Sequence, residues 1–181
     1  MLRELRDVPC VDCGERYQPY QMDFDHRDPS TKSFGVTSGR AMLMSSAKLL
    51  AEVAKCDVVC ANCHRIRTQA LSQAFASRRP PGSSVRLPYK KQRWREQARL
   101  LAQLRAAPCA DCGRVFSPYA MDFDHRDPST KSHGVMRMVG RAGTRTILAE
   151  VAKCDIVCAN CHRMRTYTRH EASSGGRSSV G

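Results

Sequence analysis

The sequence has no run of apolar residues long enough to span a membrane, and it does not open with the apolar stretch of a signal peptide. Residues 1–7 are instead mostly charged. A membrane helix needs about 20 apolar residues, and a secretory signal needs an apolar segment near its start, so the pattern favours neither. We therefore expect no membrane partner and a cytoplasmic protein.

Acidic residues are scarce relative to basic ones. The 181 residues include 17 Asp and Glu but 30 Lys and Arg, which gives a formal net charge of +13 at pH 7. A surplus of this size favours a polyanionic partner, and nucleic acid is the common one. Charge alone does not distinguish an enzyme from a binding protein.

The chain repeats itself. Residues 22–33 recur letter for letter as residues 121–132, and closely spaced cysteines recur around them. The repeat predicts two domains of one kind, at residues 1–76 and 89–171, the second opening with a basic helix. Residues 77–88 have the composition of a linker, and the Ser- and Gly-rich residues 172–181 are expected to be disordered.

Cysteine is abundant, with ten in the chain. Cytoplasmic thiols stay reduced, so paired cysteines indicate metal sites before disulfides, although buried free thiols remain the alternative. Two Cys-x-x-Cys pairs in each copy match a closed tetrahedral zinc site, and a structural ion offsets the small core of a domain of about sixty residues. Cys56 and Cys154 are expected to pack behind a strand. The predicted zinc ligands are Cys10, Cys13, Cys60 and Cys63 in one set, and Cys109, Cys112, Cys158 and Cys161 in the other.

Asp25 and His26 end a segment whose apolar and acidic residues alternate as in a half-buried strand. His64 directly follows the last cysteine, so the ion that fixes this turn also fixes the helix beginning there. Asp25 and His64 can then hold a divalent cation, with His26 as a general base. Strict alternation places His26 on the opposite face from Asp25, so the strand must bend or end there. In the second copy the corresponding residues are Asp124, His125 and His162.

Each motif has a simpler interpretation. A histidine beside a Cys-x-x-Cys turn can be a spare zinc ligand or a helix-start residue, and an Asp-His step can cap a turn. The motifs occur together, in the same order, in both copies, and this favours a catalytic site.

The order of these motifs resembles the HNH endonucleases, whose core is called ββα-metal or the His-Me finger. The resemblance covers residues 9–68 and 108–166. It implies an α+β fold of small zinc-stabilised ββα-metal domains in tandem duplication. It also implies Mg²⁺- or Mn²⁺-dependent hydrolysis of DNA, which we expect to be double-stranded, with Asp25 and His64 on the cation and His26 as the base. The Asn that braces the loop and the base in this family is replaced by Lys55 and Lys153.

The sequence thus predicts a divalent-metal-dependent DNA endonuclease with one nicking centre per repeat, so that a monomer can act as a pseudo-dimer. The alternatives are a non-catalytic zinc-containing DNA-binding protein and an RNA-binding or nucleoprotein scaffold. A non-catalytic DNA-binding protein would have no need of the Asp-His step, so this step favours the enzyme. Phosphate contacts are expected from basic residues in the loop after the base and on the helix carrying the last histidine: Lys32, Arg65, Arg67, Lys131, Arg163 and Arg165.

Overall fold

The computed structural model describes residues 1–77 and 89–175. Its contacts divide the chain into two compact units, Met1–His64 and Arg65–Gly181, so the division falls inside helix α2 (Ala61–Ser77). Each unit contains one two-stranded sheet. The predicted linker, apart from its first residue, lies outside the described residues, as does the end of the predicted tail.

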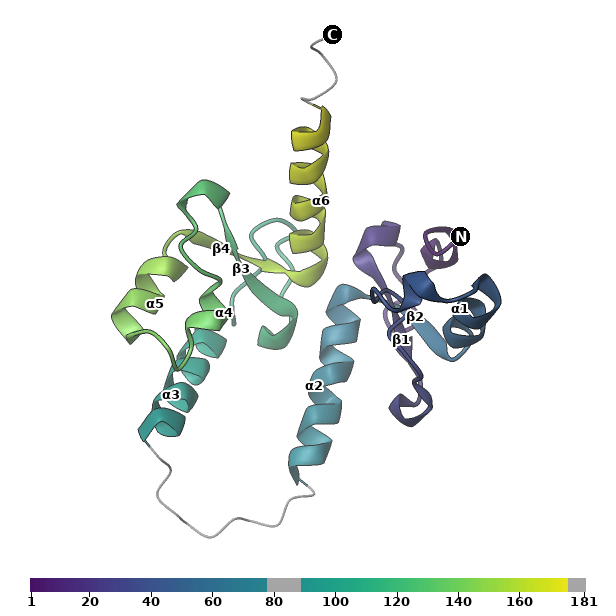
Figure 1. Ribbon diagram of the computed structural model, residues 1–181. Coiled ribbons are helices and arrows are strands. Elements are labelled where there is room, and N and C mark those ends of the chain that lie inside the picture. The colour runs from purple at the N-terminus through teal and green to yellow at the C-terminus, as the bar shows by residue number, and fades with distance from the viewer. Residues whose placement is uncertain (78–88, 176–181) are drawn as a thin grey trace. The chain divides into compact units, whose positions relative to one another are not determined.

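The first unit places two antiparallel strands before the start of a helix (Figure 1). Strand β1 (Met22–His26) pairs with β2 (Cys56–Cys60), which puts Asp25 opposite Asp57 and His26 opposite Cys56. Helix α1 (Ser46–Val53) lies between the strands in sequence, and α2 begins directly after β2. Short 3-10 segments at Glu4–Arg6, Pro19–Gln21, Pro29–Thr31 and Ala41–Leu43 complete the unit.

Two small apolar clusters form the core of the first unit. One joins Phe24 of β1 to Leu49 of α1 and to Cys56 of β2. The other joins Met22 and Val59 to the buried cysteines Cys10 and Cys60. Since neither cluster is large, much of the stability of this unit depends on what holds the cysteines together.

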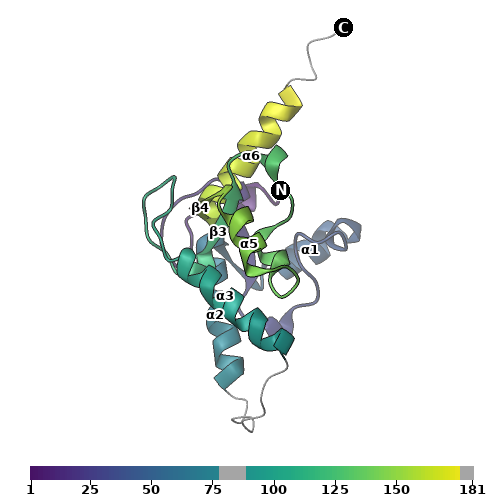
Figure 2. The same ribbon diagram turned by 90° about the vertical axis from the view of Figure 1, so that its left-hand side faces the viewer.

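The second unit repeats this order with an added helix, α3 (Tyr89–Leu104), in front. Strand β3 (Met121–His125) pairs with β4 (Cys154–Cys158), and α6 (Ala159–Gly175) follows β4 directly. Helices α4 (Val135–Met138) and α5 (Thr144–Val151) separate the strands, and 3-10 segments occupy Pro118–Ala120 and Pro128–Thr130. Figure 2 shows α3 and α5 on the same side of this sheet.

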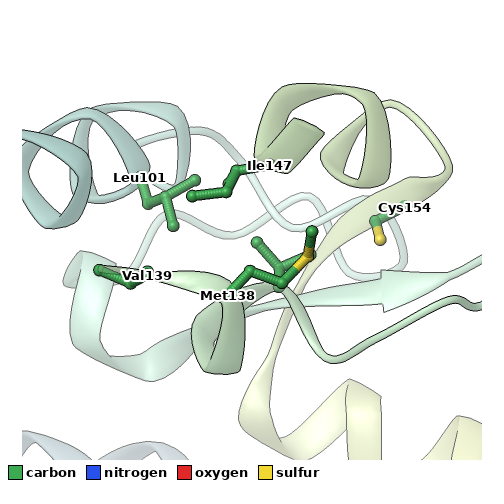
Figure 3. Close-up of a cluster of buried hydrophobic side chains, with 6 residues drawn as sticks. Leu101, Met138, Val139, Ile147 and Cys154 are labelled. Carbon is green, nitrogen blue, oxygen red and sulfur yellow. The ribbon is translucent and has the colours of Figure 1, made fainter. Parts of the chain in front are cut away.

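The main core of the second unit lies between these helices and β4. Leu101 of α3 packs with Met138, Val139 and Ile147, and the cluster reaches Cys154 (Figure 3). Buried Gln97 of α3 fixes the helix further, because its amide donates to the Ala142 carbonyl at 3.0 Å and accepts from the Gly140 amide at 2.8 Å. Helix α3 is therefore part of the fold of this unit.

The C-terminal helix is longer than the sequence analysis expects. Helix α6 continues through residues 172–175, which composition assigns to a disordered tail. The helix extends into these residues because each residue added to an existing helix gains a hydrogen bond at little cost.

Across residues 1–77 and 89–175, no helix is both long enough and apolar enough to cross a membrane.

Candidate metal centres

Each unit brings together the four cysteines that the sequence assigns to it. In the first unit, two come from the turn before β1, one from the end of β2 and one from the first turn of α2. The four sulfurs of each set lie within 4.8 Å of one another. A tetrahedral zinc ion with Zn–S bonds of about 2.3 Å needs sulfurs about 3.8 Å apart, so both sets fit such an ion. The two sets are Cys10, Cys13, Cys60, Cys63 and Cys109, Cys112, Cys158, Cys161.

Backbone geometry supports the role of the first cysteine of each set. The Cys60 amide donates to the Cys10 sulfur, and the Cys158 amide to the Cys109 sulfur, both at 3.2 Å. Gly14 closes the first turn with a φ of 71°, a conformation that favours glycine. These turns hold thiolate-directed amides in place before any ion binds.

The charges within a set also call for a cation. Although burial opposes ionisation of Cys109, backbone N–H groups lower the pKa of its thiol to about 7. In Cys161 burial dominates and, together with the adjacent Cys158 sulfur, raises the pKa far above its ordinary value. A bound cation reverses this balance because it favours each thiolate.

The fifth cysteine of each copy lies outside these sets. Cys56 and Cys154 are buried in the apolar clusters, and each sulfur lies 3.4 Å from a backbone carbonyl of the preceding helix. Burial raises the pKa of Cys154 to about 11. Both residues pack in the core, as the sequence predicts.

In each unit, a second group of polar side chains joins two aspartates of the first strand to the histidine after the last cysteine. The Nδ1 atom of His64 lies 2.9 Å from an Asp23 carboxylate oxygen, and its Nε2 atom lies 3.5 Å from an Asp25 oxygen. In the second unit His162 lies 2.7 Å from Asp122 and 3.5 Å from Asp124. The structure thus brings the predicted ligands Asp25 and His64 together, and likewise Asp124 and His162.

Asp23 and Asp122 are additions that the sequence analysis misses. The signal was present, because Asp23 and Asp25 are two residues apart in a strand and therefore share a face. Asp23 occupies one imidazole nitrogen, which leaves the other directed at Asp25. A metal-bound histidine commonly donates its other ring N–H to a carboxylate, which fixes the orientation of the imidazole.

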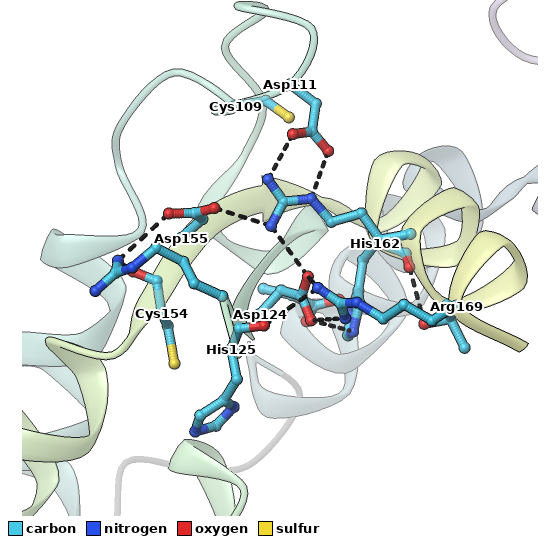
Figure 4. A network of polar contacts seen from close by, with 12 residues as sticks. Cys109, Asp111, Asp124, His125, Cys154, Asp155, His162 and Arg169 are labelled. Atoms are coloured by element: carbon cyan, nitrogen blue, oxygen red, sulfur yellow. Dashed lines mark hydrogen bonds and ion pairs between the residues drawn. The ribbon is translucent and has the colours of Figure 1, made fainter. Parts of the chain in front are cut away.

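His26 and His125 do not join this group. Both are buried, and His26 lies on the opposite face of the strand from Asp25, as alternation requires. Figure 4 shows the His125 ring pointing away from the carboxylate of Asp124. No bend in the strand brings the two side chains to one side.

A buried glutamate holds each of these histidines. The Nε2 atom of His26 lies 2.8 Å from Glu52, and that of His125 lies 2.8 Å from Glu150. A carboxylate only accepts, so Nε2 carries the hydrogen and Nδ1 of the neutral ring carries the lone pair. Sequence pattern could not reveal this partner, because Glu52 sits on a helix distant in sequence.

The same glutamate fixes the loop that follows β1. Glu52 accepts from the Ser33 amide at 2.7 Å and pairs with the Lys55 ammonium at 2.7 Å. Lys55 in turn donates to the Thr31 carbonyl at 3.0 Å. The Lys55 ammonium and the N–H donors hold the pKa of Glu52 well below its ordinary range, although burial acts in the opposite direction.

The basic residues predicted to contact phosphate occupy different settings. Lys32 and Lys131 are exposed, in the loops after β1 and β3, directly after the short 3-10 segments there. Arg65 and Arg163 are partly exposed in the first turns of α2 and α6. Arg165 instead pairs with Asp111, Asp124 and Asp155 at 2.6, 3.1 and 3.0 Å. Arg67 occupies the equivalent position in α2 and is also partly buried.

Comparison of the chain with protein-family models, with curated proteins and with solved structures found no match. The two cysteine sets and the Asp–His groups beside them are therefore the features that indicate function. In the described parts of the chain, the cysteine sets are the only clusters of three or more such ligands close enough to share an ion. At the Asp25–His64 pair, any further ligands would come from water or a bound phosphate.

Proposed function

We propose that this protein is a divalent-metal-dependent DNA endonuclease of the HNH type. The observation that carries the proposal is the Asp23–His64–Asp25 group at the junction of two antiparallel strands and a helix. Its occurrence in both units, next to a four-cysteine set, matches the motif order of this family. The net charge of +13 suits a polyanionic substrate.

The pair Asp25 and His64 fits a divalent cation. Their ligand atoms lie 3.5 Å apart, a separation available to two atoms that each sit about 2.1 Å from one ion. About a third of the His64 side chain and a fifth of the Asp25 side chain are exposed, so water and a phosphate oxygen can reach the same point. When bound there, Mg²⁺ or Mn²⁺ supplies Lewis-acid stabilisation of the charge that develops on the phosphate.

His26 supplies the general base in this proposal. Its Nδ1 lone pair accepts a proton from water while the water oxygen bonds to phosphorus and the bond to the leaving oxygen breaks. Glu52 holds the other nitrogen and stabilises the imidazolium that results. His26 is only 8% exposed and lies on the face of β1 opposite Asp25. The base and the cation can therefore act on one phosphate only at the end of β1, which stops at His26.

In this proposal, Glu52 and Lys55 together take the role of the Asn that HNH endonucleases have and this sequence lacks. Lys55 stands at that position and braces the loop through Thr31, while Glu52 braces the base. Two residues thus divide the work of one amide side chain. Glu52 is accordingly a positioning residue.

Replacement Glu52→Gln should lower kcat roughly tenfold, a part of the 10²–10⁴ that a general base supplies. KM should stay near its original value, because the exposed phosphate contacts do not change. Lys55 keeps its bonds to Thr31 and Ser33, so zinc content should also persist. Single-turnover nicking measures the effect. Equal loss in kcat and in zinc content would indicate a structural role instead.

Replacement Asp23→Ala should weaken Mn²⁺ binding about 10- to 100-fold, the usual cost of removing the partner of a metal-bound histidine. The zinc sites should stay filled, since Asp23 contributes no sulfur ligand. Calorimetric titration of zinc-loaded protein with Mn²⁺ measures the change. Unaltered Mn²⁺ affinity would show that Asp23 does not orient His64 for metal binding.

The proposal is tested by incubating zinc-loaded protein with supercoiled plasmid, with and without Mg²⁺ or Mn²⁺. We expect metal-dependent nicked or linear product with 5′-phosphate ends. Retardation of the DNA in a gel without cleavage under any divalent metal would identify the alternative, a non-catalytic DNA-binding protein.

A further inference from the structure

The exposed side of helix α3 carries a row of basic residues. Lys91, Arg95 and Arg99 are all exposed and follow one another at intervals of four residues. Residues four apart are neighbours on a helix surface, so the three cations form a single row along the helix. At a rise of about 1.5 Å per residue, the row is about 12 Å long.

The other side of α3 is fixed to the second unit. Leu101 is 1% exposed within the apolar core of that unit. The buried Gln97 amide bonds to the Ala142 carbonyl and to the Gly140 amide. Gly140 also lies against Trp94, because a Cβ atom on this glycine would approach the indole to 3.0 Å. The core contacts therefore fix the rotation of the helix about its axis and leave the basic row in solvent.

The three cations have no counter-ion in the described parts of the chain. Within residues 1–77 and 89–175, the side chains of the row make no ion pair and no hydrogen bond. Glu96 is the one acidic residue of α3, and its carboxylate accepts from the Gln92 amide at 3.0 Å. The charge of the row is therefore available to a partner outside the chain.

The arginines of α6 are in a different setting. The Arg169 guanidinium binds both oxygens of Asp124, at 2.9 Å each (Figure 4). Arg165 is paired with three aspartates. Phosphate binding by either arginine would first have to break these charge-assisted hydrogen bonds. The row on α3 can bind an anion without such a rearrangement.

The row does not stabilise the helix that carries it. Like charges four residues apart repel each other, so Arg95 is unfavourable beside both Lys91 and Arg99. Lys91 also lies in the first turn, where the positive end of the helix dipole disfavours a cation. Charge placed against these local rules is expected at a functional surface. Contact with a polyanion would offset both effects.

We propose that this row on α3 is a docking surface for the phosphate backbone of double-stranded DNA. The inference rests on the proposed function, which makes DNA the substrate. One strand of a duplex carries a phosphate about every 3.4 Å along the axis, so a row of about 12 Å spans three to four phosphates. Contacts of this kind position the duplex and do not select a sequence.

An anionic membrane fits this surface less well than DNA. A helix that lies in a membrane interface inserts an apolar face among the lipids. The apolar face of α3 is already buried, since Leu101 belongs to the core and Ala98 and Leu104 pack against it. The exposed face offers charge alone, which suits the surface of a duplex.

The test compares two triple variants that remove equal charge, one lysine and two arginines each. The first variant removes the row: Lys91→Gln, Arg95→Gln, Arg99→Gln. The control removes three exposed cations of the first unit that do not form a row on one helix: Arg3→Gln, Arg40→Gln, Lys48→Gln. Affinity of zinc-loaded protein for a duplex oligonucleotide is measured by fluorescence anisotropy over a range of salt concentrations, without Mg²⁺ or Mn²⁺. Zinc content and helical circular dichroism establish that each variant is folded.

Each phosphate contact contributes about 0.9 to the slope of log affinity against log salt concentration. The row variant should therefore lose about 2.7 from this slope and bind about 500 times more weakly at about 0.1 M salt. The control variant should keep the slope of the parent. The three single variants of the row should each lose about 0.9, and they give the same comparison if the triple variant does not fold.

Equal losses in the row variant and the control would show that net charge attracts the DNA, and this result would overturn the inference. An unchanged slope in the row variant, or a parent that does not bind duplex at low salt, would overturn it as well. Sedimentation with vesicles of phosphatidylserine and phosphatidylcholine provides a further arm. Binding to vesicles that depends on the row, with binding to DNA that does not, would identify a membrane partner instead.

Plasmid cleavage with Mn²⁺, measured on the same samples, separates this inference from the proposed function. A parent that binds duplex through the row but never cleaves it would leave the docking surface intact and remove the nuclease. A parent that cleaves, with a row variant that binds as tightly as the parent, would leave the nuclease intact and remove the docking surface.

Discussion

Removal of zinc by a strong chelator should unfold both units and abolish every activity of the protein. The four-cysteine sets tie the turn before the first strand to the end of the second strand and to the following helix in each unit. Neither unit has a large core, and structural zinc in small domains contributes about 10–16 kcal/mol of binding free energy. Loss of the helical circular dichroism signal on chelation, and two zinc ions per chain by elemental analysis beforehand, are the expected results.

A matched pair of cysteine variants separates zinc loss from general damage to the core. Cys60→Ser should lose one zinc ion and destabilise the first unit. Cys56→Ser removes another buried sulfur, one outside the set, and should keep both ions, at a cost of about 1–3 kcal/mol for a buried hydroxyl. Metal-free protein that still unfolds cooperatively at the temperature of the parent would contradict the assignment.

Spacing and alternation were enough to predict the parts of the site that are close in sequence. The Cys-x-x-Cys turns converge because the strands that carry them pair, and His64 is placed because it directly follows Cys63. Alternation along residues 22–26 separates Asp25 from His26 and places Asp23 on the same face as Asp25. Both features follow from local patterns, the two-residue alternation of a strand and the Cys-x-x-Cys turn.

The rest depends on contacts that no local pattern encodes. Glu52 lies 26 residues beyond His26, and Arg169 lies 45 residues beyond Asp124, so both pairings require the folded units. Glu52 is a charged residue on a short amphipathic helix, so its residue type predicts an exposed side chain. It is nevertheless only 2% exposed. Buried charges are rare and are retained where a partner fixes them, which explains why hydrophobic periodicity overlooks them.

The largest effect on catalysis should come from the two histidines that follow Asp25 and Asp124. The double variant His26→Ala, His125→Ala should cleave plasmid about 10²–10⁴ times more slowly, the range supplied by a general base. Zinc content and DNA affinity should remain near those of the parent, because neither ring contacts a cysteine set or the exposed arginines. The single variants His26→Ala and His125→Ala, measured separately, apportion the loss between the two units.

Added imidazole distinguishes a base from a structural residue at this position. Truncation to Ala leaves a ring-sized space beside Glu52, whose carboxylate can hold a free imidazole as it holds His26. If His26 transfers a proton, imidazole should restore part of the cleavage rate of His26→Ala, with saturation, and should leave the parent rate unchanged. If His26 only stabilises the loop, thermal stability should rise with imidazole while cleavage stays lost. Cleavage by the double variant at the parent rate would place the base elsewhere.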